Sequence, residues 1–338
     1  MLISRMNTPA LVGDVGYVDR DHDSLYLPDR LWLAKSRRGA NTDMRWLTYY
    51  FSSERGSHTL QGLATGTSGS MKNIPKSRVL DLEIPTPSAP EQRSIANAIT
   101  TADDLIATLE RLTAKKQAIK QGMMQQLLTG RTRLPGFSGR WLNSTLGAIA
   151  RVSGGGTPST RISSFWGGGI PWFTPAEINA EGSGLVSSSE RTITREGLAS
   201  SAATLLPAGT VLVTSRASIG NCAVAAVPVS TNQGFTSLVP RDSRSTWFLY
   251  YWIQQYRSEL EFRAAGSTFL EISASKVAAI SLRQPNLEEQ VAIGIAIRDA
   301  DAEIDTLDNC LTKARAIKKG MMQQLLTGRT RLPVAATS

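Results

Sequence analysis

The chain contains one sequence twice, AIKQGMMQQLLTGRTRLP at residues 118–135 and AIKKGMMQQLLTGRTRLP at residues 316–333. Gln121 in the first copy is replaced by Lys319 in the second, and the other seventeen of the eighteen positions are identical. A repeat of this length indicates a duplicated structural unit. A two-fold repeated body suits a bipartite target, and double-stranded DNA is the commonest target of that kind.

Each copy predicts a long amphipathic helix, over Glu91–Thr129 and Glu289–Thr327. Apolar residues recur there every three or four positions, which is the spacing of a helix with one apolar seam. Gly130 suits a left-handed C-cap turn and Pro135 prevents the helix from restarting, and the repeat supplies the same pair after the second helix. We expect the helices to pack antiparallel as a coiled coil, with Cys310 as a packed small hydrophobic side chain. The predicted seam consists of Ile95, Ile99, Ala102, Ile106, Leu109, Leu112, Ile119, Met123 and Leu127, and of Ile293, Ile297, Ala300, Ile304, Leu307, Cys310, Ala314, Ile317, Met321 and Leu325.

The composition favours an anionic partner. Lys and Arg outnumber Asp and Glu by 37 to 28, a net charge of +9, which points to nucleic acid ahead of a membrane surface. Two cysteines and two histidines cannot form a disulfide framework or a His-rich metal site. We find neither a secretory signal nor a membrane span in the sequence, and we expect a reduced, cytoplasmic protein without a cofactor of its own.

The segment between the helices has a different pattern, of Gly-rich turns and short β-type runs. Thr210–Thr214 and Ala223–Val227 are predicted strands, and a shorter helix is expected near Trp247–Glu261. Before the first helix, Val79–Ile84 also has the pattern of a strand, and three prolines follow it. These segments predict mixed α+β domains.

Two short segments near the start of the chain match segments of the later domain. Met1–Arg5 resembles Leu212–Arg216, and Trp46–Tyr50 resembles Trp247–Tyr251. The first copy nevertheless lacks about seventy residues at its start, so we expect either an upstream start or a truncated first domain. The predicted organisation is an incomplete first domain at 1–88, a helix at 89–135, a second domain at 136–285, a helix at 286–333 and a tail at 334–338.

No catalytic constellation is evident. Lys never follows Gly, so a Walker A motif is absent, and Gly154–Gly156 lack the dinucleotide fingerprint and are better explained as a structural turn. The Asn-Pro-Pro-aromatic and Asp-Pro-Pro-aromatic loops of base methyltransferases are missing, as is a Ser/His/Asp or Cys/His pairing in a suitable context. We therefore expect no enzymatic activity.

Polar and basic residues in or beside loops are the candidates for DNA contacts, because such side chains bind phosphates and base edges. Arg216 follows a predicted strand, and Arg5 is placed at the equivalent position of the first copy, where either a shared DNA contact or a shared structural salt bridge is possible. Trp166 and Trp172 are interpreted as packing residues. The candidate DNA-binding residues are Arg5, Arg30, Ser153, Thr157, Ser215, Arg216, Asn232 and Gln233.

Several motifs resemble the specificity subunit of type I restriction-modification systems. They are Leu-Leu-Thr-Gly at the end of each long helix, followed by a basic residue and Arg-Leu, and Ser-Gly-Gly-Gly-Thr-Pro-Ser at 153–159, Gly-Ile-Pro-Trp at 169–172, Pro-Asp-Arg-Leu-Trp at 28–32 and Ala-Pro-Glu-Gln-Arg at 89–93. The resemblance covers essentially the whole chain.

This resemblance implies two α+β target-recognition domains, here with the first incomplete, held apart by two antiparallel helices that measure an unread spacer. Each domain would read one half of a split double-stranded DNA site. The subunit would have no catalysis and would dock two methyltransferase subunits, with motor-nuclease restriction subunits joining the complex. S-adenosylmethionine and ATP would belong to those partners.

Two alternatives are open from the sequence. The chain could be a structural module that docks the methyltransferase without reading a full DNA site. It could also be a nuclease or methyltransferase whose motifs are too degenerate to detect. A measurement of DNA binding by the chain and by its complex distinguishes the docking module from a DNA-reading subunit. A test for cutting or methylation of DNA by the chain alone distinguishes the enzyme from both.

Overall fold

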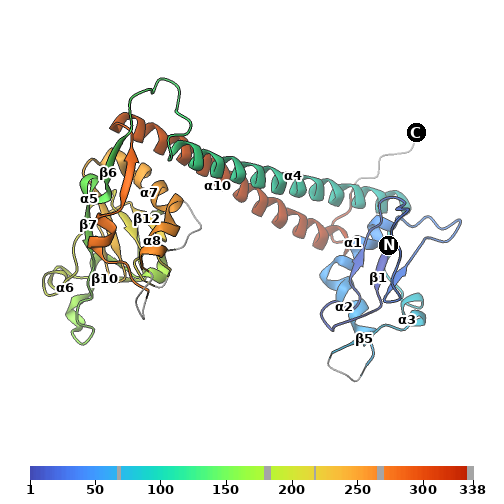
Figure 1. The fold of residues 1–338 in the computed structure, drawn as a ribbon. Coiled ribbons are helices and arrows are strands. Elements are labelled where there is room, and N and C mark those ends of the chain that lie inside the picture. Colours follow the sequence, from blue (N-terminus) through green and yellow to red (C-terminus); the bar gives the residue numbers. More distant parts are fainter. Residues whose placement is uncertain (67–69, 179–183, 217, 265–269, 333–338) are drawn as a thin grey trace. The chain divides into compact units, whose positions relative to one another are not determined.

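The computed structural model describes residues 1–66, 70–178, 184–216, 218–264 and 270–332. The chain forms two compact units: unit 1 comprises Met1–Arg111 and Asp308–Ser338, and unit 2 comprises Leu112–Leu307. Two long helices, α4 (Ala89–Leu127) and α10 (Leu287–Leu325), contribute to both units (Figure 1). The expected α+β class is confirmed, and each predicted long helix begins and ends two residues earlier than expected.

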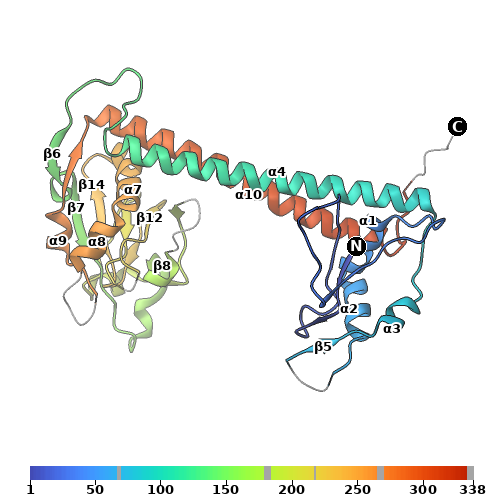
Figure 2. The ribbon, with the colours of Figure 1, turned by 45° about the vertical axis from the view of Figure 1, so that its right-hand side comes forward.

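Helices α4 and α10 run antiparallel within each unit (Figures 1 and 2). In unit 2, Lys116 pairs with Glu303 and Lys120 with Asp301, so residue numbers rise along one helix as they fall along the other. In unit 1, Lys318 pairs with Asp103 and Arg315 with Glu110, again with the residue numbers running in opposite directions. The predicted antiparallel pair is therefore present.

In the middle of the predicted seam, Ile304 and Ala314 are buried as expected, but several other residues are exposed. Leu112, Ile119 and Ile317 of the predicted seam are 38%, 45% and 61% exposed, and Cys310 is exposed instead of packed. Thr113 at 7% and Leu311 at 9%, which the repeat places at equivalent positions, are buried instead. Leu112 was placed in the seam because its side chain is apolar. The seven-residue step from Ile304 to Leu311 on α10 keeps the seam on one face of that helix, and Thr113 is the equivalent position on α4.

The main sheet of unit 2 has the order β7-β14-β11-β12-β9. Strand β11 alternates between two buried faces, because Val211 and Val213 pack toward the core that contains α7, while Leu212 packs with Phe173 and Phe235. The strands are β7 (Ala150–Gly154), β9 (Leu185–Val186), β11 (Val211–Val213), β12 (Cys222–Ala225) and β14 (Thr236–Pro240). The predicted strands near 210–214 and 223–227 are thus confirmed.

Smaller elements complete unit 2. A second sheet has the order β10-β8-β13 and a third pairs β15 with β6. The expected helix near Trp247–Glu261 is two helices, α7 (Thr246–Gln255) and α8 (Arg257–Ala264). The other elements are β6 (Leu142–Thr145), α5 (Leu146–Ile149), η1 (Ser163–Phe165), β8 (Trp166–Phe173), η2 (Pro175–Glu177), β10 (Arg191–Ile193), α6 (Arg195–Ala199), β13 (Ser230–Thr231), η3 (Ser243–Ser245), α9 (Ala274–Ala278) and β15 (Ser281–Gln284).

Unit 1 is built on a three-stranded sheet of order β3-β1-β4. Its core joins Ile3 and Ile74 to Trp46 of α1 and to Ile95 and Ile99 of α4. The elements are β1 (Leu2–Ser4), β2 (Met6–Asn7), β3 (Val15–Gly16), β4 (Leu31–Leu33), α1 (Met44–Ser52), α2 (Glu54–Gly62), β5 (Lys72–Asn73) and α3 (Lys76–Leu80).

The predicted strand at Val79–Ile84 is not formed. The segment contains the end of α3 and then irregular backbone. The repeat-equivalent segment of unit 2 contains β15, which is a strand because it pairs with β6. Among the described residues of unit 1 no strand pairs with this segment, and a strand requires a partner.

Candidate nucleic-acid interface

The polar residues predicted in unit 2 lie where three segments of the main sheet meet: the end of β7, the residues that follow β11 and the residues that precede β14. Ser215 N donates to Gly234 O at 2.8 Å, and Thr157 Oγ1 donates to Gln233 Oε1 at 2.6 Å. Asn232 Oδ1 accepts from Gly234 N at 2.8 Å. The structure therefore brings together the predicted residues of three separate segments, and we call Thr157, Ser215, Arg216, Asn232 and Gln233 the unit 2 loop cluster.

The loop cluster contains both exposed and buried side chains. Gln233 and Thr157 are exposed, whereas Ser215 is buried at 1%. Ser153 is also buried, at 8%, and its position in β7 pairs with Ser237 of β14. Gln233 and Thr157 can therefore meet a ligand directly, and Ser215 and Ser153 support the backbone beneath them.

Arg216 forms an ion pair with Glu271, with Nη2 and Oε1 2.8 Å apart. The two residues also form an isolated antiparallel bridge. Both side chains stay partly exposed, at 46% and 42%. An exposed ion pair contributes little to stability, so the Arg216 guanidinium can exchange Glu271 for a phosphate or a base edge.

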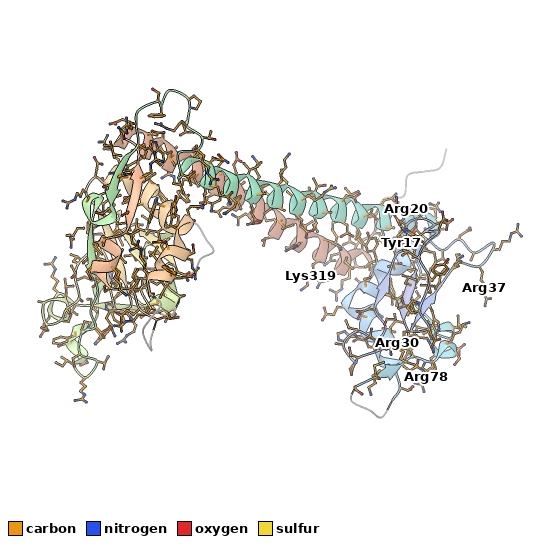
Figure 3. The ribbon with its side chains drawn as sticks, in the orientation of Figure 1. Tyr17, Arg20, Arg30, Arg37, Arg78 and Lys319 are labelled. Carbon is orange, nitrogen blue, oxygen red and sulfur yellow. The ribbon has the colours of Figure 1, made fainter. Side chains whose placement is uncertain are left out.

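In unit 1, the predicted residues Arg5 and Arg30 lie at adjacent ends of the paired strands β1 and β4. Arg5 Nη2 lies 2.9 Å from Asp29 Oδ2, and its Nε donates to Asp29 O. Arg5 N donates to Arg30 O, and the Arg30 side chain is exposed. Figure 3 shows Arg30 toward the end of unit 1 where Arg78 also lies, with Lys319 on α10. Arg5 is held by a salt bridge, and Arg30 is the more available donor.

The equivalence of Arg5 and Arg216 was wrong by one residue. Ile74 N donates to Arg5 O, and the repeat-related Ile272 N donates to Ser215 O. Met6 pairs with Asn73 as Arg216 pairs with Glu271. Arg5 therefore corresponds to Ser215. The similar side chains suggested an alignment of Arg5 with Arg216, and the backbone pairing differs from that alignment by one residue.

The glycine turn and the tryptophans near the loop cluster are structural, as predicted. A Cβ at Gly155 would lie 2.2 Å from Asn232 O, so only glycine allows this close approach. Trp172 is 3% exposed and its Nε1 donates to Gly156 O. Sequence reasoning missed Arg191, whose guanidinium lies 3.5 Å from the centroid of the Trp166 ring. Arg191 lies on β10, and Trp166 lies on the paired strand β8. A basic residue and a tryptophan on neighbouring strands were the sequence signal for this contact.

A Tyr-Asp-Lys cluster recurs in both units and was not predicted. In unit 2, Tyr251 OH donates to Asp301 Oδ2 at 2.6 Å, and Lys120 Nζ lies 2.5 Å from Asp301 Oδ1. Burial first, and then the hydrogen bond to Asp301, raises the pKa of Tyr251. The cluster joins α7 of the domain to both long helices.

Unit 1 contains the same arrangement. Tyr49 OH donates to Asp103 Oδ2 at 2.8 Å, and Lys318 Nζ lies 2.5 Å from Asp103 Oδ1. Burial raises the pKa of Tyr49 as well. Tyr49 therefore corresponds to Tyr251 and not to Tyr250, which is a second one-residue correction to the sequence comparison.

A buried carboxylate explains the repeated sequence after each helix. Glu289, 1% exposed, accepts two hydrogen bonds from Arg133, at 2.5 Å each. In unit 1 the repeat-related Glu91 accepts from Arg331. The segment that follows one helix thus closes over the start of the other helix, and both partners belong to the motifs found in the sequence.

The described residues contain neither a cluster of metal ligands nor a helix that could span a membrane. No group of three or more His, Cys, Asp or Glu side chains in these ranges could hold a metal ion. None of the helices in the same part of the chain has the length and apolar character needed to cross a bilayer.

Comparison with known proteins agrees with this arrangement. The family described as "Type I restriction modification DNA specificity domain" matches residues 139–314, more than half of the chain. The chain belongs to this family. The matched residues include the whole loop cluster.

Two relatives carry the name of specificity subunit. The type I restriction enzyme MjaIX specificity subunit of Methanocaldococcus jannaschii is 38% identical over 159 residues, 46% of this chain and 37% of the relative. The EcoR124I/EcoR124II specificity subunit of Escherichia coli is 31% identical over 244 residues, 69% of this chain and 57% of the relative. The chain thus spans less than two thirds of either relative.

A solved structure shares the fold. The crystal structure of a type I restriction-modification system S subunit from M. genitalium aligns with a TM-score of 0.56 at 19% identity. The alignment covers 84% of this chain and 73% of that chain. At this identity the likeness is evidence for the fold alone.

Proposed function

We propose that the chain is the DNA-sequence-recognition subunit of a type I restriction-modification complex. It binds a bipartite double-stranded DNA site, docks two methyltransferase subunits, and through that complex associates with restriction subunits. It has no catalytic activity of its own and acts in the cytoplasm. The domain limits predicted from the sequence, with recognition domains at 1–88 and 136–285, are part of this proposal.

The unit 2 loop cluster is the observation that carries the proposal. Exposed Gln233 and Thr157 stand beside Arg216 on loops fixed by a buried sheet, in the part of the chain that matches the family. The Gln233–Thr157 hydrogen bond uses the carbonyl oxygen of Gln233, so its amide group can donate to a base edge. The net charge of +9 favours the phosphate contacts that position such a reader.

A binding assay on the full chain, alone and with a type I methyltransferase subunit, tests this function. We expect a complex with two methyltransferase subunits that binds one DNA sequence more tightly than random duplex, by a factor of at least about 10³. Assembly with the methyltransferase without any sequence preference would support the docking module instead. Cutting or methylation of DNA by the chain alone would contradict the non-catalytic assignment.

A further inference from the structure

A basic cleft lies within unit 1, between α2 and the C-terminal half of α10. The cleft has a volume of 950 Å³, and five Lys or Arg side chains line it against two carboxylates. We call it the α10 cleft, and its basic residues are Arg55, His58, Arg315, Lys318, Lys319 and Arg329. Figure 3 shows Lys319 on α10, beside α2. The excess of cations makes the cleft attractive to an anion.

Three of these cations are available for a ligand. Lys318 is engaged by Asp103 and Arg315 by Glu110. Within the described ranges, no carboxylate lies at ion-pair distance from Arg55, Lys319 or Arg329, and all three are exposed. Cations without a carboxylate partner can neutralise a bound anion at little cost.

The repeat shows that part of this charge is specific to the second copy. Lys319 is the single difference between the two eighteen-residue copies, and it replaces Gln121. Four residues earlier, Arg315 replaces Gln117. Residues four apart lie on one face of a helix, so both replacements add positive charge to the face of α10 that lines the cleft.

The lining favours a nucleic-acid backbone over a protein surface. Protein interfaces concentrate aromatic side chains and exclude charges from their centres. The lining of the α10 cleft includes no Phe, Tyr or Trp, and seven of its fourteen residues are Lys, Arg, Asp or Glu. Duplex DNA presents one negative charge about every 1.7 Å of its axis, which suits several cations on one helix face.

We propose that the α10 cleft binds the phosphate backbone of duplex DNA through Lys319, Arg55 and Arg329, independently of base sequence. This inference rests on the proposed function, because it adds a backbone contact to a DNA-recognition subunit. The long helix α10 then holds DNA directly, in addition to carrying the domains. The two repeats are inequivalent, since the matching face of α4 has Gln121 where α10 has Lys319.

The test is Lys319→Gln in the full chain assembled with the methyltransferase subunit. Gln is tolerated at the matching exposed position 121, so the melting temperature should not change. We expect binding to cognate and random duplexes to weaken by the same factor, roughly three- to tenfold. The slope of log affinity against log salt should decrease in magnitude by about one.

A charge-swapped control is the double variant Lys319→Gln, Gln121→Lys, which keeps the net charge of the parent. We expect it to bind as weakly as Lys319→Gln, because the cation has left the cleft. Recovery of parental affinity would show that only net charge matters and would overturn the inference.

The remaining outcomes are also decisive. Parental DNA affinity and salt slope in Lys319→Gln would overturn the backbone contact while the proposed function stands. Weaker assembly with the methyltransferase at unchanged DNA affinity would reassign the cleft to a protein partner. Failure of the parent complex to bind any duplex would instead remove the proposed function, and the inference with it.

Discussion

At the scale of single residues, Glu289 is a buried carboxylate that depends on a single ion pair. Its carboxylate is 1% exposed and both hydrogen bonds from Arg133 satisfy it. Removing one partner of a buried ion pair is costly because the other charge stays desolvated. The Arg of the repeated Arg-Leu motif therefore stabilises the fold by pairing with a buried carboxylate.

We predict that Arg133→Gln lowers the free energy of unfolding, because the buried Glu289 carboxylate is left without its partner. Chemical denaturation measures the effect, and Arg331→Gln in unit 1 is the matched variant because it frees Glu91. The double variant Arg133→Gln, Glu289→Gln should recover part of the loss. An unchanged denaturation midpoint in Arg133→Gln would contradict the role assigned to this pair.

Tyr251 links α7 to Asp301 of α10, and this predicts a pH dependence. Its pKa is raised in the folded state, so the stability it contributes is fully present below its unfolded pKa of about 10 and is lost as pH rises through the folded pKa. We expect Tyr251→Phe to cost about 2 kcal/mol at neutral pH and to weaken the loss of stability in alkali. Denaturation series from pH 7 to above pH 10 measure both effects, with the half-buried Tyr49→Phe as a milder comparison. Equal alkaline slopes for parent and Tyr251→Phe would refute the assignment.

Arg216 has a different expected effect, on DNA binding and not on folding. The ion pair with Glu271 is exposed, so Arg216→Ala should leave stability within about 0.5 kcal/mol of the parent. If Arg216 binds a base edge, cognate binding should weaken by about 1–3 kcal/mol with little change on random DNA. A phosphate contact would weaken both equally. Parental binding to both duplexes would exclude Arg216 from the interface.

Single residues also show where sequence comparison is least precise. The paired segments of the two domains were recognised, but Arg5 corresponds to Ser215 and Tyr49 to Tyr251, each one residue from the expected match. Similar side chains suggested the alignment, whereas backbone pairing and the Asp contacts fix the true one. Which side chains meet across loops depends on that pairing, so the members of the loop cluster could be predicted but the contacts between them could not.

At the scale of elements, the long helices were predictable because periodicity and capping residues agree over 39 residues in each. The seam in their middle was less predictable, since apolar Leu112 lies next to the buried Thr113. The strand at Val79–Ile84 failed for another reason. A short apolar run becomes a strand only if a neighbour supplies hydrogen bonds, and periodicity alone does not show this.

The buried seam gives a direct test of the helix pair. Ile304 is 8% exposed and Ile317, on the same helix, is 61% exposed. We predict that Ile304→Asp lowers the melting temperature and the helical circular dichroism signal, because a carboxylate without a partner costs several kcal/mol in a buried seam. Ile317→Asp should change both by little. Equal behaviour of the two variants would contradict the seam.

At the scale of the whole molecule, the duplication organises both units. Each unit combines a β-sheet domain with one end of each long helix, and the same Tyr-Asp-Lys and Arg-Glu contacts recur in both. A repeated body of this kind fits a bipartite DNA site. The described residues of unit 1 form a main sheet of three strands and those of unit 2 one of five, so we expect unit 2 to carry most of the sequence preference.

In the proposed function, the unit 2 loop cluster reads the DNA sequence. Selection from a random duplex library tests it most directly, with complexes of the methyltransferase subunit and either the parent chain or Gln233→Ala. We predict that the parent enriches one bipartite sequence and that Gln233→Ala relaxes one or two adjacent base pairs in a single half-site, each by about 1–3 kcal/mol. No enriched sequence with the parent, or identical base preferences for the parent and for Thr157→Ala, Asn232→Ala and Gln233→Ala, would contradict the claim.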